Sequence, residues 1–358
     1  MYKRTITERE AGQRLDKYLH KLLPEAGNGF LYKMLRKKNI VLNDKKADGR
    51  EKLVCGDTVS VYFSDETLHK FMGEQRKWLM NTDTEQADAH KNVAHTDMVN
   101  IDNEDKIRTD STYIDTIYVY PEIIFENTHI LIVNKPAGML TQKASPKDFS
   151  LNEWLINYLI ESHQLTEAGL QTFRPSACNR LDRNTSGIVL CAKSVQGAQF
   201  LSEALRTRSL HKYYLLYVKG CIIEEKVLEG YLVKDEKSNK VEVFSASKEG
   251  VDKKSYICTR YIPIRQEKDK TLLEVELITG KSHQIRAHLA SIGHPLLGDY
   301  KYGDRAWNDE YKKAFGVEHQ LLHAYKVVFE ENGSPFDDIS NKEFMAQLPE
   351  IFNEVSKK

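Results

Sequence analysis

Apolar positions in the first 63 residues repeat with two different periods. In GQRLDKYLHKLLP and FLYKMLRKKN (12–24 and 30–39) the apolar side chains recur every three or four residues, which is typical of amphipathic helices. Two shorter pieces, IVLN and DTVSVYF (40–43 and 57–63), have the character of strands. The pattern predicts one small α/β domain over residues 1–63.

This regularity is lost between residues 64 and 118. The segment is rich in Asp, Asn and Thr and has almost no periodic apolar positions, so we expect an acidic linker that is partly disordered. One short helix could dock within this segment through its apolar residues Phe71, Trp78, Leu79 and Met80.

From residue 119 onward, strand patterns and helix patterns alternate. Helices are expected at 151–163, 195–208 and 282–293, and strands at 117–135 (two, with a turn), 187–194, 211–220, 255–264 and 271–280. Several strands follow one another through short turns, which favours antiparallel pairing. The prediction for residues 119–358 is an α+β domain with a mixed, largely antiparallel sheet.

Composition adds a charge gradient that the whole-chain average hides. The net charge is zero, yet residues 1–63 carry 14 Lys and Arg against 8 Asp and Glu, and residues 64–118 carry 6 against 12. The basic end is therefore a candidate phosphate-binding surface. With 41% apolar and 29% charged residues, no signal-peptide pattern at the N-terminus and no long apolar run, the chain is expected to be soluble and cytoplasmic.

The cysteines and histidines do not form a metal-binding or disulfide pattern. The five cysteines are far apart and include no C-x-x-C pair. His283 and His288 are five residues apart, where a helical zinc pair needs a spacing of four. We therefore expect no metal site and no disulfide framework.

Three polar clusters are candidates for chemistry, and each has an ordinary structural explanation. CNRLDRNTSG (178–187) resembles a turn before a buried strand, LITGKSHQIRAHLA (277–290) a capped helix start, and HKYYLLYVKG (211–220) a plain strand. The piece TGKS also resembles the end of a phosphate-binding P-loop. That motif needs a glycine five positions before Gly280, where this chain has Val275, so a nucleotide hydrolase is disfavoured.

Taken in order, the clusters resemble a known family. R-L-D-x-x-T-S-G, then A-K, K-x-Y, L-x-T-G-K-x-H-Q-I-R and H-P-L-L-G-D occur between VNKPAGM and LLHAYKVVF, and together they resemble the RluA-type pseudouridine synthases over residues 122–328. Residues 1–63 resemble the small RNA-binding domain of ribosomal protein S-four type. The alternative for its basic helix is an ordinary solvated face. If the resemblance holds, the side chains expected to contact RNA are Lys33, Arg36, Lys37 and Lys38.

The resemblance implies roles for individual residues. Its catalytic positions fall on Asp182, Tyr214 and Arg286. The neighbouring motif positions expected to bind substrate are Arg180, Arg183, Thr185, His283 and Gln284. Two positions depart from the commonest pattern, because Asn179 replaces a usual histidine and Lys281 a frequent arginine.

The implied reaction converts uridine in RNA to pseudouridine. A carboxylate beside the anomeric carbon suits the positive charge that develops on the sugar, although Asp182 attacking the sugar or the base and Asp182 removing a sugar proton all remain open. Arg286 is expected to orient Asp182. Tyr214 is expected to stack on the base, and its hydroxyl is a candidate base for the proton on carbon 5.

The resemblance also implies the partners of the protein. No cofactor or metal is required, and the chain is expected to act as a monomer on RNA. Large-subunit ribosomal RNA is the favoured substrate, with transfer RNA as the alternative. A non-catalytic RNA-binding factor in ribosome assembly is the competing function class.

Overall fold

The computed structural model describes residues 1–72, 120–235, 240–244 and 255–357, in two compact units. Unit 1 comprises Met1–Thr5, Arg14–Glu51 and Asp57–Val119, and unit 2 comprises Ile6–Gln13, Lys52–Gly56 and Tyr120–Lys358. The domain limits at residues 63 and 119 stay predictions. Most of the expected linker lies outside the described residues, and its first part forms helix α3 (Asp65–Met72), which includes Phe71.

Unit 1 is built from the helices and strands that the periodicity predicts. Strands β1 (Tyr2–Thr5), β2 (Ile40–Leu42), β3 (Lys45–Lys46) and β4 (Thr58–Val61) form an antiparallel sheet in the order β1-β4-β2-β3. Helices α1 (Leu15–Leu22) and α2 (Asn28–Arg36) each bury one apolar face. The buried side chains of the two helices include Leu15, Tyr18, Leu19, Leu22, Leu31, Met34 and Leu35.

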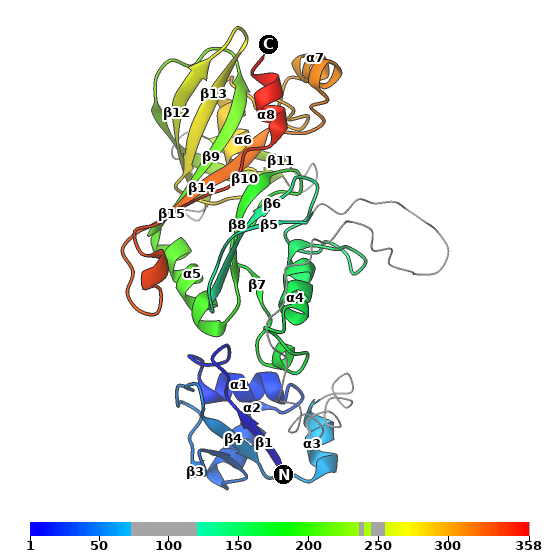
Figure 1. The fold of residues 1–358 in the computed structure, drawn as a ribbon, viewed down its shortest axis with the longest axis vertical. Helices are drawn as coiled ribbons and strands as arrows, with labels where there is room; N and C mark the ends of the chain where they lie inside the picture. Colours follow the sequence, from blue (N-terminus) through cyan, green and yellow to red (C-terminus); the bar gives the residue numbers. More distant parts are fainter. Residues whose placement is uncertain (73–119, 236–239, 245–254, 358) are drawn as a thin grey trace, which may run out of the picture. The chain divides into compact units, whose positions relative to one another are not determined.

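Unit 2 is organised around an 11-stranded mixed sheet (Figure 1). Its main path runs β11-β10-β12-β13-β9-β14-β8-β6-β5, while β15 pairs with β14 and β7 with β8. The strands are β5 (Glu122–Glu126), β6 (Ile130–Lys135), β7 (Ser176–Ala177), β8 (Ser186–Ala192), β9 (Leu210–Lys219), β10 (Lys226–Asp235), β11 (Lys240–Phe244), β12 (Tyr256–Gln266), β13 (Lys270–Leu277), β14 (Leu322–Phe329) and β15 (Glu343–Met345). The predicted α+β class with a largely antiparallel sheet is confirmed.

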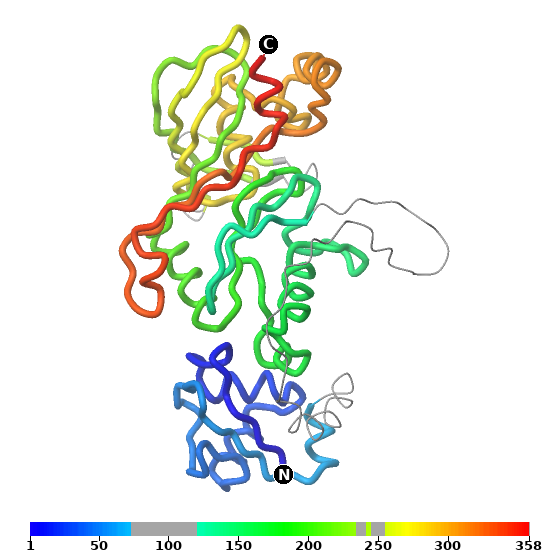
Figure 2. Tube along the Cα trace, viewed as in Figure 1, coloured from blue at the N-terminus to red at the C-terminus, as the bar shows by residue number. Residues whose placement is uncertain are grey.

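Helices cover both faces of this sheet because its central strands are apolar throughout. Along β8, Ile188 and Leu190 join the cluster that contains α5 (Val195–Thr207), whereas Val189 and Cys191 join the cluster that contains α4 (Leu151–Glu161). Successive side chains of a strand point to opposite faces, so an unbroken apolar run is what a doubly covered strand needs. Figure 2 traces β8 between β6 and β14.

One pair of neighbouring strands in the described sheet, β8 and β14, is parallel, and it lies at the start of β8. His323 is opposite Ser186, and Ala324 is opposite Gly187. Gly187 has φ of +110°, and a Cβ there would lie 2.2 Å from the carbonyl oxygen of Ala324. Glycine is therefore required at this position by both backbone conformation and space. The glycine of the TSG motif therefore determines where the loop that carries Asp182 joins the sheet.

Two further helices of unit 2 were not expected from the sequence. Helix α7 (Arg305–Phe315) begins at Asp304, whose side chain accepts the N–H of Trp307, and ends at Gly316 with φ of +70°. Helix α8 (Glu350–Val355) contributes Phe352 to the same apolar cluster. The β10–β11 hairpin was also unexpected.

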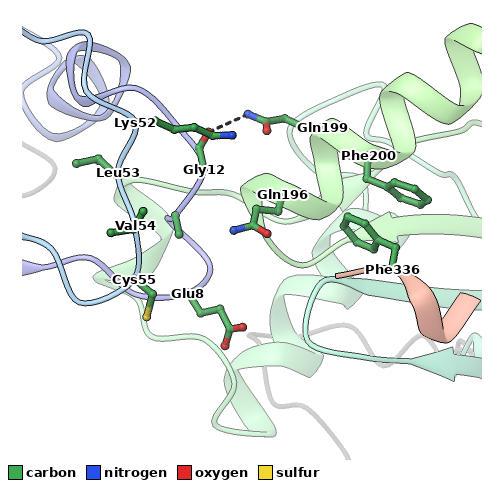
Figure 3. A pocket seen from close by; sticks show the side chains of 11 residues that line it. Glu8, Gly12, Lys52, Leu53, Val54, Cys55, Gln196, Gln199, Phe200 and Phe336 are labelled. Atoms are coloured by element: carbon green, nitrogen blue, oxygen red, sulfur yellow. Dashed lines mark hydrogen bonds between the residues drawn. The ribbon is translucent and has the colours of Figure 1, made fainter. Parts of the chain in front are cut away.

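The short segments Ile6–Gln13 and Lys52–Gly56 belong to unit 2, where they line a cavity of about 520 Å³ together with α5 (Figure 3). Gln199 donates to the carbonyl of Gly12 at 3.4 Å. Phe200 stacks on Phe336 with 4.0 Å between ring centroids. This cavity shares no lining residue with the pocket around Asp182. No helix in the described parts of the chain is long and apolar enough to cross a membrane.

Candidate active site

The loop that carries Asp182 is held by backbone-directed hydrogen bonds. The amide of Asn179 accepts the N–H of Leu190 at 2.7 Å and donates to the carbonyl of Ile188 at 3.3 Å, which ties the loop to β8. Thr141 accepts the N–H of Leu181 and donates to its carbonyl. The side chain of Asn179, which replaces the usual histidine, thus binds backbone groups of β8 and does not line the pocket.

A buried lysine joins this loop to the turn after β6. The Nζ of Lys135 donates to the carbonyls of Pro136 at 2.8 Å, Met139 at 2.9 Å and Arg183 at 3.3 Å. Arg183 donates in turn from Nε to the carbonyl of Gly138 at 3.0 Å. Arg183, which the resemblance predicted to bind substrate, therefore helps to position the loop in this structure.

The charge state of Lys135 is set by two opposing effects. Burial lowers the pKa of Lys135 to about 7, and the negative charge of Asp182 partly opposes this shift. Three carbonyl acceptors match the three N–H groups of an ammonium, whereas a neutral amine has only two. The contacts therefore favour the charged form, which places a positive charge beneath the Asp182 loop.

Asp182, Arg286 and Asp299 form one ionic network. Arg286 donates from Nη1 to Oδ2 of Asp182 at 3.0 Å. Its Nε and Nη2 donate to the two carboxylate oxygens of Asp299 at 2.6 and 2.9 Å. A two-point contact fixes the plane of a guanidinium. Asp299 therefore orients Arg286, which in turn contacts Asp182.

Burial acts against every charge in this network, and pairing overcomes it. Burial favours the neutral form of Arg286, yet the hydrogen bonds and charge of Asp299 keep the pKa of Arg286 above its ordinary value. Burial likewise tends to raise the pKa of Asp299, but the Arg286 contacts and two backbone N–H groups hold that pKa below its usual range. Both side chains thus remain ionised at neutral pH.

His283 lies near the same carboxylate oxygen of Asp182 that accepts from Arg286. Its Nε2 is 3.8 Å from Oδ2 of Asp182, and its Nδ1 is 2.9 Å from the hydroxyl of Tyr302. The residue precedes α6 (Gln284–Ser291) in a left-handed conformation with φ of +55°, which turns the ring back toward the pocket. Burial lowers the pKa of His283, so the ring is neutral at neutral pH.

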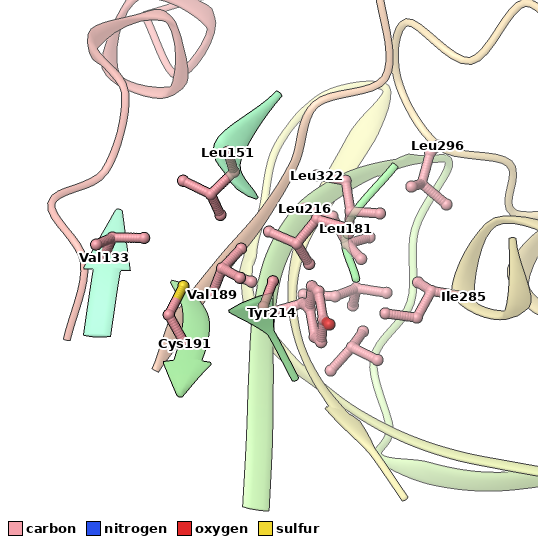
Figure 4. Close-up of a cluster of buried hydrophobic side chains, with 14 of the residues drawn as sticks. Val133, Leu151, Leu181, Val189, Cys191, Tyr214, Leu216, Ile285, Leu296 and Leu322 are labelled. Carbon is pink, nitrogen blue, oxygen red and sulfur yellow. The ribbon is translucent and has the colours of Figure 1, made fainter. Parts of the chain in front are cut away.

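Tyr214 comes from β9 and lies deep in the largest apolar cluster, among side chains that include Leu181, Ile285 and Leu322 (Figure 4). Only 5% of the residue is exposed. Burial, followed by the nearby charge of Asp182, raises the pKa of the Tyr214 phenol. A phenol that keeps its proton is a poor acceptor for another proton, so this environment favours packing against a base over general-base chemistry.

The pocket between these side chains is small. It has a volume of about 60 Å³, and its lining includes Arg180, Asp182, Thr185, Tyr214 and Lys281. Solvent reaches this pocket at its rim. Arg180 at that rim is exposed, which suits a movable contact.

Two neighbouring site residues differ in how their polar groups are used. The hydroxyl of Thr185 is buried in the pocket wall with no hydrogen-bond partner. The amide of Gln284 instead accepts from Thr279 and from the backbone of Lys281, and donates to Thr259 and to the carbonyl of Cys258. Gln284 has no unused capacity for substrate. Its contacts shape the loop before α6, which differs from the expected binding role.

The four basic residues predicted to contact RNA lie in unit 1, away from this network in the sequence. Lys33 and Arg36 are exposed on α2, and Lys37 and Lys38 follow directly at its end, also exposed. None of them belongs to the pocket lining.

Comparison with known proteins shows what the chain is similar to. The family model for RNA pseudouridylate synthases matches residues 129–291. This range contains Asp182, Tyr214 and Arg286 in the geometry described above. The segment that carries the site is therefore similar to the RNA pseudouridylate synthases.

Individual members of the family are similar over most of their length. The ribosomal large subunit pseudouridine synthase C of Vibrio cholerae is 29% identical over 331 residues, which covers 90% of this chain and 87% of that protein. The protein of the same name from Escherichia coli K12 is 27% identical and covers 92% and 88%. These matches confirm the resemblance predicted from the motifs. The protein is a pseudouridine synthase, which is an isomerase.

A solved structure supports the fold. The human RNA pseudouridylate synthase domain containing 4 superposes with a TM-score of 0.51 at 21% identity and covers 65% of this chain and 90% of its own. This similarity is evidence for the architecture of the synthase and does not bear on its substrate.

Sequence reasoning missed several residues that build the site. Asp299 is the last residue of the H-P-L-L-G-D motif, and Lys135 lies within VNKPAGM, so the motifs contained both without assigning them. Tyr302 follows Asp299 by three residues and carried no signal of its own. Its position depends on Asp299, whose Oδ1 accepts the backbone N–H of Tyr302 at 3.1 Å.

Proposed function

We propose that this synthase converts specific uridines of large-subunit ribosomal RNA to pseudouridine, as a monomer in the cytoplasm. The relatives from Vibrio cholerae and Escherichia coli are named for activity on that subunit, and they match about nine-tenths of the chain. The observation that carries the catalytic part is the Asp182–Arg286–Asp299 network beside a pocket.

The chemistry begins with cleavage of the bond between the ribose and N1 of uracil. Positive charge then develops on the sugar, and the carboxylate of Asp182 is available to stabilise or capture it. Its side chain is 32% exposed, whereas that of Asp299 is fully buried. Asp182 is thus the carboxylate that can reach substrate, and Asp299 supports it through Arg286.

The target uridine must leave its stack before it enters the pocket. Extrusion costs a few kcal/mol, and packing on an aromatic ring returns about 1 to 3 kcal/mol per base. Tyr214 offers such a ring at the floor of the pocket. One aromatic contact therefore roughly offsets extrusion, and the remaining binding energy has to come from contacts to the phosphate backbone.

We assign those backbone contacts to the exposed basic residues of unit 1 and to the pocket rim. Ammonium and guanidinium groups bind phosphates without reading sequence. The side chains proposed for this role are Lys33, Arg36, Lys37, Lys38 and Arg180.

The substrate is tested by pseudouridine-specific chemical mapping of ribosomal and transfer RNA from cells with and without this gene. We expect one or a few large-subunit uridines to lose the modification in its absence. Loss confined to transfer RNA would overturn the proposed substrate, and loss at no site would overturn the function.

The catalytic assignment is tested with purified protein on unmodified ribosomal RNA. Asp182→Asn keeps the size of the side chain and removes its charge, so turnover should fall by at least about 10⁴-fold while RNA affinity stays within a few fold. Asp337→Asn, at an exposed aspartate outside the pocket, is the control and should be fully active. Retained turnover by Asp182→Asn would remove Asp182 from the mechanism.

A further inference from the structure

A chain of polar contacts ends at Oδ2 of Asp182, the same oxygen that accepts from Arg286. The backbone N–H of Val241 in β11 donates to the hydroxyl of Tyr302 at 3.1 Å. That hydroxyl is 2.9 Å from Nδ1 of His283, whose Nε2 is 3.8 Å from Oδ2 of Asp182. The chain brings together residues from three separate parts of unit 2.

The contacts select one protonation pattern of the imidazole. The Asp182 carboxylate, whose Oδ2 is 3.8 Å from Nε2, favours the neutral tautomer with its proton on Nε2, and Nδ1 then accepts the hydroxyl proton of Tyr302. A neutral ring that accepts at Nδ1 carries its proton on Nε2. The Nε2–H then points toward the carboxylate of Asp182, where a donor is electrostatically favoured.

The surroundings keep the ring neutral and well placed. Burial lowers the pKa of His283 first, Asp182 opposes this, and Arg286 and Lys301 add to it, with Asp299 a weaker opposing charge. The rings of His283 and Tyr302 meet edge to face at 5.6 Å between centroids. The residue is half-buried in the pocket wall, so its free edge faces the space that a base must occupy.

We propose that His283 is a catalytic hydrogen-bond donor to the departing uracil and that Tyr302 is the residue that positions it. This inference rests on the proposed function. When the bond between the anomeric carbon and N1 breaks, its electron pair stays on the base, which leaves as an anion with charge on N1, O2 and O4. The Nε2–H of His283 stabilises that charge by donating to a carbonyl oxygen, while Asp182 meets the positive charge on the sugar.

This arrangement assigns different roles to two neighbouring groups of the pocket. The anionic carboxylate lies beside the sugar, and the neutral donor lies beside the base. A neutral donor suits this place, because it binds the uncharged uracil of the ground state weakly and the anion strongly. Interactions that strengthen only as charge develops raise kcat with little effect on KM.

The test uses two substitutions of similar size at position 283. His283→Asn tolerates the left-handed backbone and retains a group near Nδ1, but it does not reach the position of Nε2. His283→Gln extends an amide N–H toward that position. We expect His283→Asn to lower kcat by about 100-fold with KM within about twofold, and His283→Gln to recover at least about tenfold of that loss.

Tyr302→Phe tests the positioning role. It removes only the hydroxyl and keeps the ring, whose centroid lies 5.3 Å from Cζ of Arg286. We expect kcat to fall by about tenfold in the wild-type background and to stay unchanged in the His283→Asn background, because the two residues act as one unit. An equal additional loss in both backgrounds would overturn the assignment to Tyr302.

Substrate analogues provide a readout that a structural role would not change. A stem-loop RNA around the mapped uridine is prepared with oxygen or with sulfur at O2 or O4 of the target, since sulfur accepts hydrogen bonds poorly. We expect one thio substitution to slow the wild type by about tenfold and to have no further effect in His283→Asn. A thio effect that persists in the variant, or normal kcat in His283→Asn, would overturn the inference alone. Absence of wild-type turnover on the oxygen substrate would overturn the proposed function as well.

Discussion

Unit 2 contains two buried ionic clusters of similar composition and opposite character. The first is the site network of Asp182, Arg286 and Asp299. The second lies at the β12–β13 turn, where Lys270 pairs with Glu267 at 2.6 Å and Asp269 accepts from the side chains of Trp307 and Tyr311. Both clusters place charges in the interior, yet only the first borders a pocket with unused polar groups.

The turn cluster lines neither the pocket around Asp182 nor the cavity beside α5. Lys270 is fully buried, and its ammonium lies 5.7 and 5.3 Å from the ring centroids of Tyr217 and Tyr311. In the site network the Asp182 side chain is 32% exposed, and the hydroxyl of neighbouring Thr185 has no partner. Buried charge by itself therefore does not mark an active site. What distinguishes the active site is a charged group that can still form hydrogen bonds and that lies beside a pocket.

Among the variants that compare the two clusters, the largest effect is expected for Asp299→Asn in the site network. The substitution removes the charge that holds Arg286 in place, so kcat should fall by about 10² to 10³-fold, as it does when one transition-state contact is lost. Breaking a buried pair also costs about 3 to 5 kcal/mol of stability. Single-turnover kinetics and urea unfolding measure the two effects. Asp309→Asn, at an exposed aspartate that accepts from Tyr300, is the control. A kcat within threefold of the wild type would show that Arg286 is positioned without Asp299.

Lys270→Met is the corresponding test of the turn cluster. It leaves Glu267 without its lysine, so the free energy of unfolding should fall by about 3 kcal/mol while kcat, measured where the variant is folded, stays unchanged. Urea unfolding and steady-state kinetics check the two halves. The double variant Lys270→Met with Glu267→Gln should lose less stability than the single one. A tenfold change in kcat would contradict the division between the two clusters.

Two buried histidines sharpen the comparison because they have no charged partner. Burial lowers the pKa of His288 and of His323 to about 4 each. The Nδ1 atom of each ring is hydrogen-bonded to a hydroxyl, from Thr259 and Ser186 respectively, and the backbone of Ala346 partly opposes the pKa shift of His323. Since the unfolded chain binds these protons near pH 6.5, the stability that the neutral rings provide is complete above pH 6.5 and is lost as the pH falls toward 4.

The expected loss between pH 6.5 and 5 is about 2 kcal/mol for each histidine. Urea unfolding at both pH values measures it. The double variant His288→Asn with His323→Asn should reduce this pH dependence by about half or more, although it is less stable at neutral pH. His163→Asn, at an exposed position, should leave the dependence as in the wild type. An unchanged slope in the double variant would place the acid sensitivity elsewhere.

Local sequence patterns predicted the helices and strands whose apolar side chains repeat with a regular spacing. The run GIVLCA became the doubly covered β8, and the basic and apolar faces of α2 were both predicted. Helix α7 was missed, although Asp304 and Gly316 are ordinary helix-boundary residues. Its apolar face consists mainly of Trp307 and Tyr311, too few positions to stand out from their charged neighbours.

Only those parts of the site that belong to recognisable motifs could be predicted from the sequence. The contact between Asp182 and Arg286 joins residues 104 positions apart, and the motif order alone placed them together. The roles of Lys135, Asp299 and Gln284 depend on which backbone groups lie beside them, and no local pattern records that. Gln284 was expected to bind substrate because it lies between His283 and Arg286, but the fold uses all of its polar groups.

The smallest effect is expected for Thr185→Val, which removes a hydroxyl that the free protein does not use. Removing an unpartnered buried polar group should leave stability unchanged or raise it slightly, because no hydrogen bond is lost. If substrate supplies the missing partner, kcat/KM should fall by about tenfold, equivalent to one hydrogen bond of about 1.4 kcal/mol. Thr185→Ser keeps the hydroxyl and should retain most activity. Unfolding and steady-state kinetics on the same preparations separate the two readouts. A loss of stability with unchanged kcat/KM would mean that Thr185 packs the pocket wall and does not bind substrate.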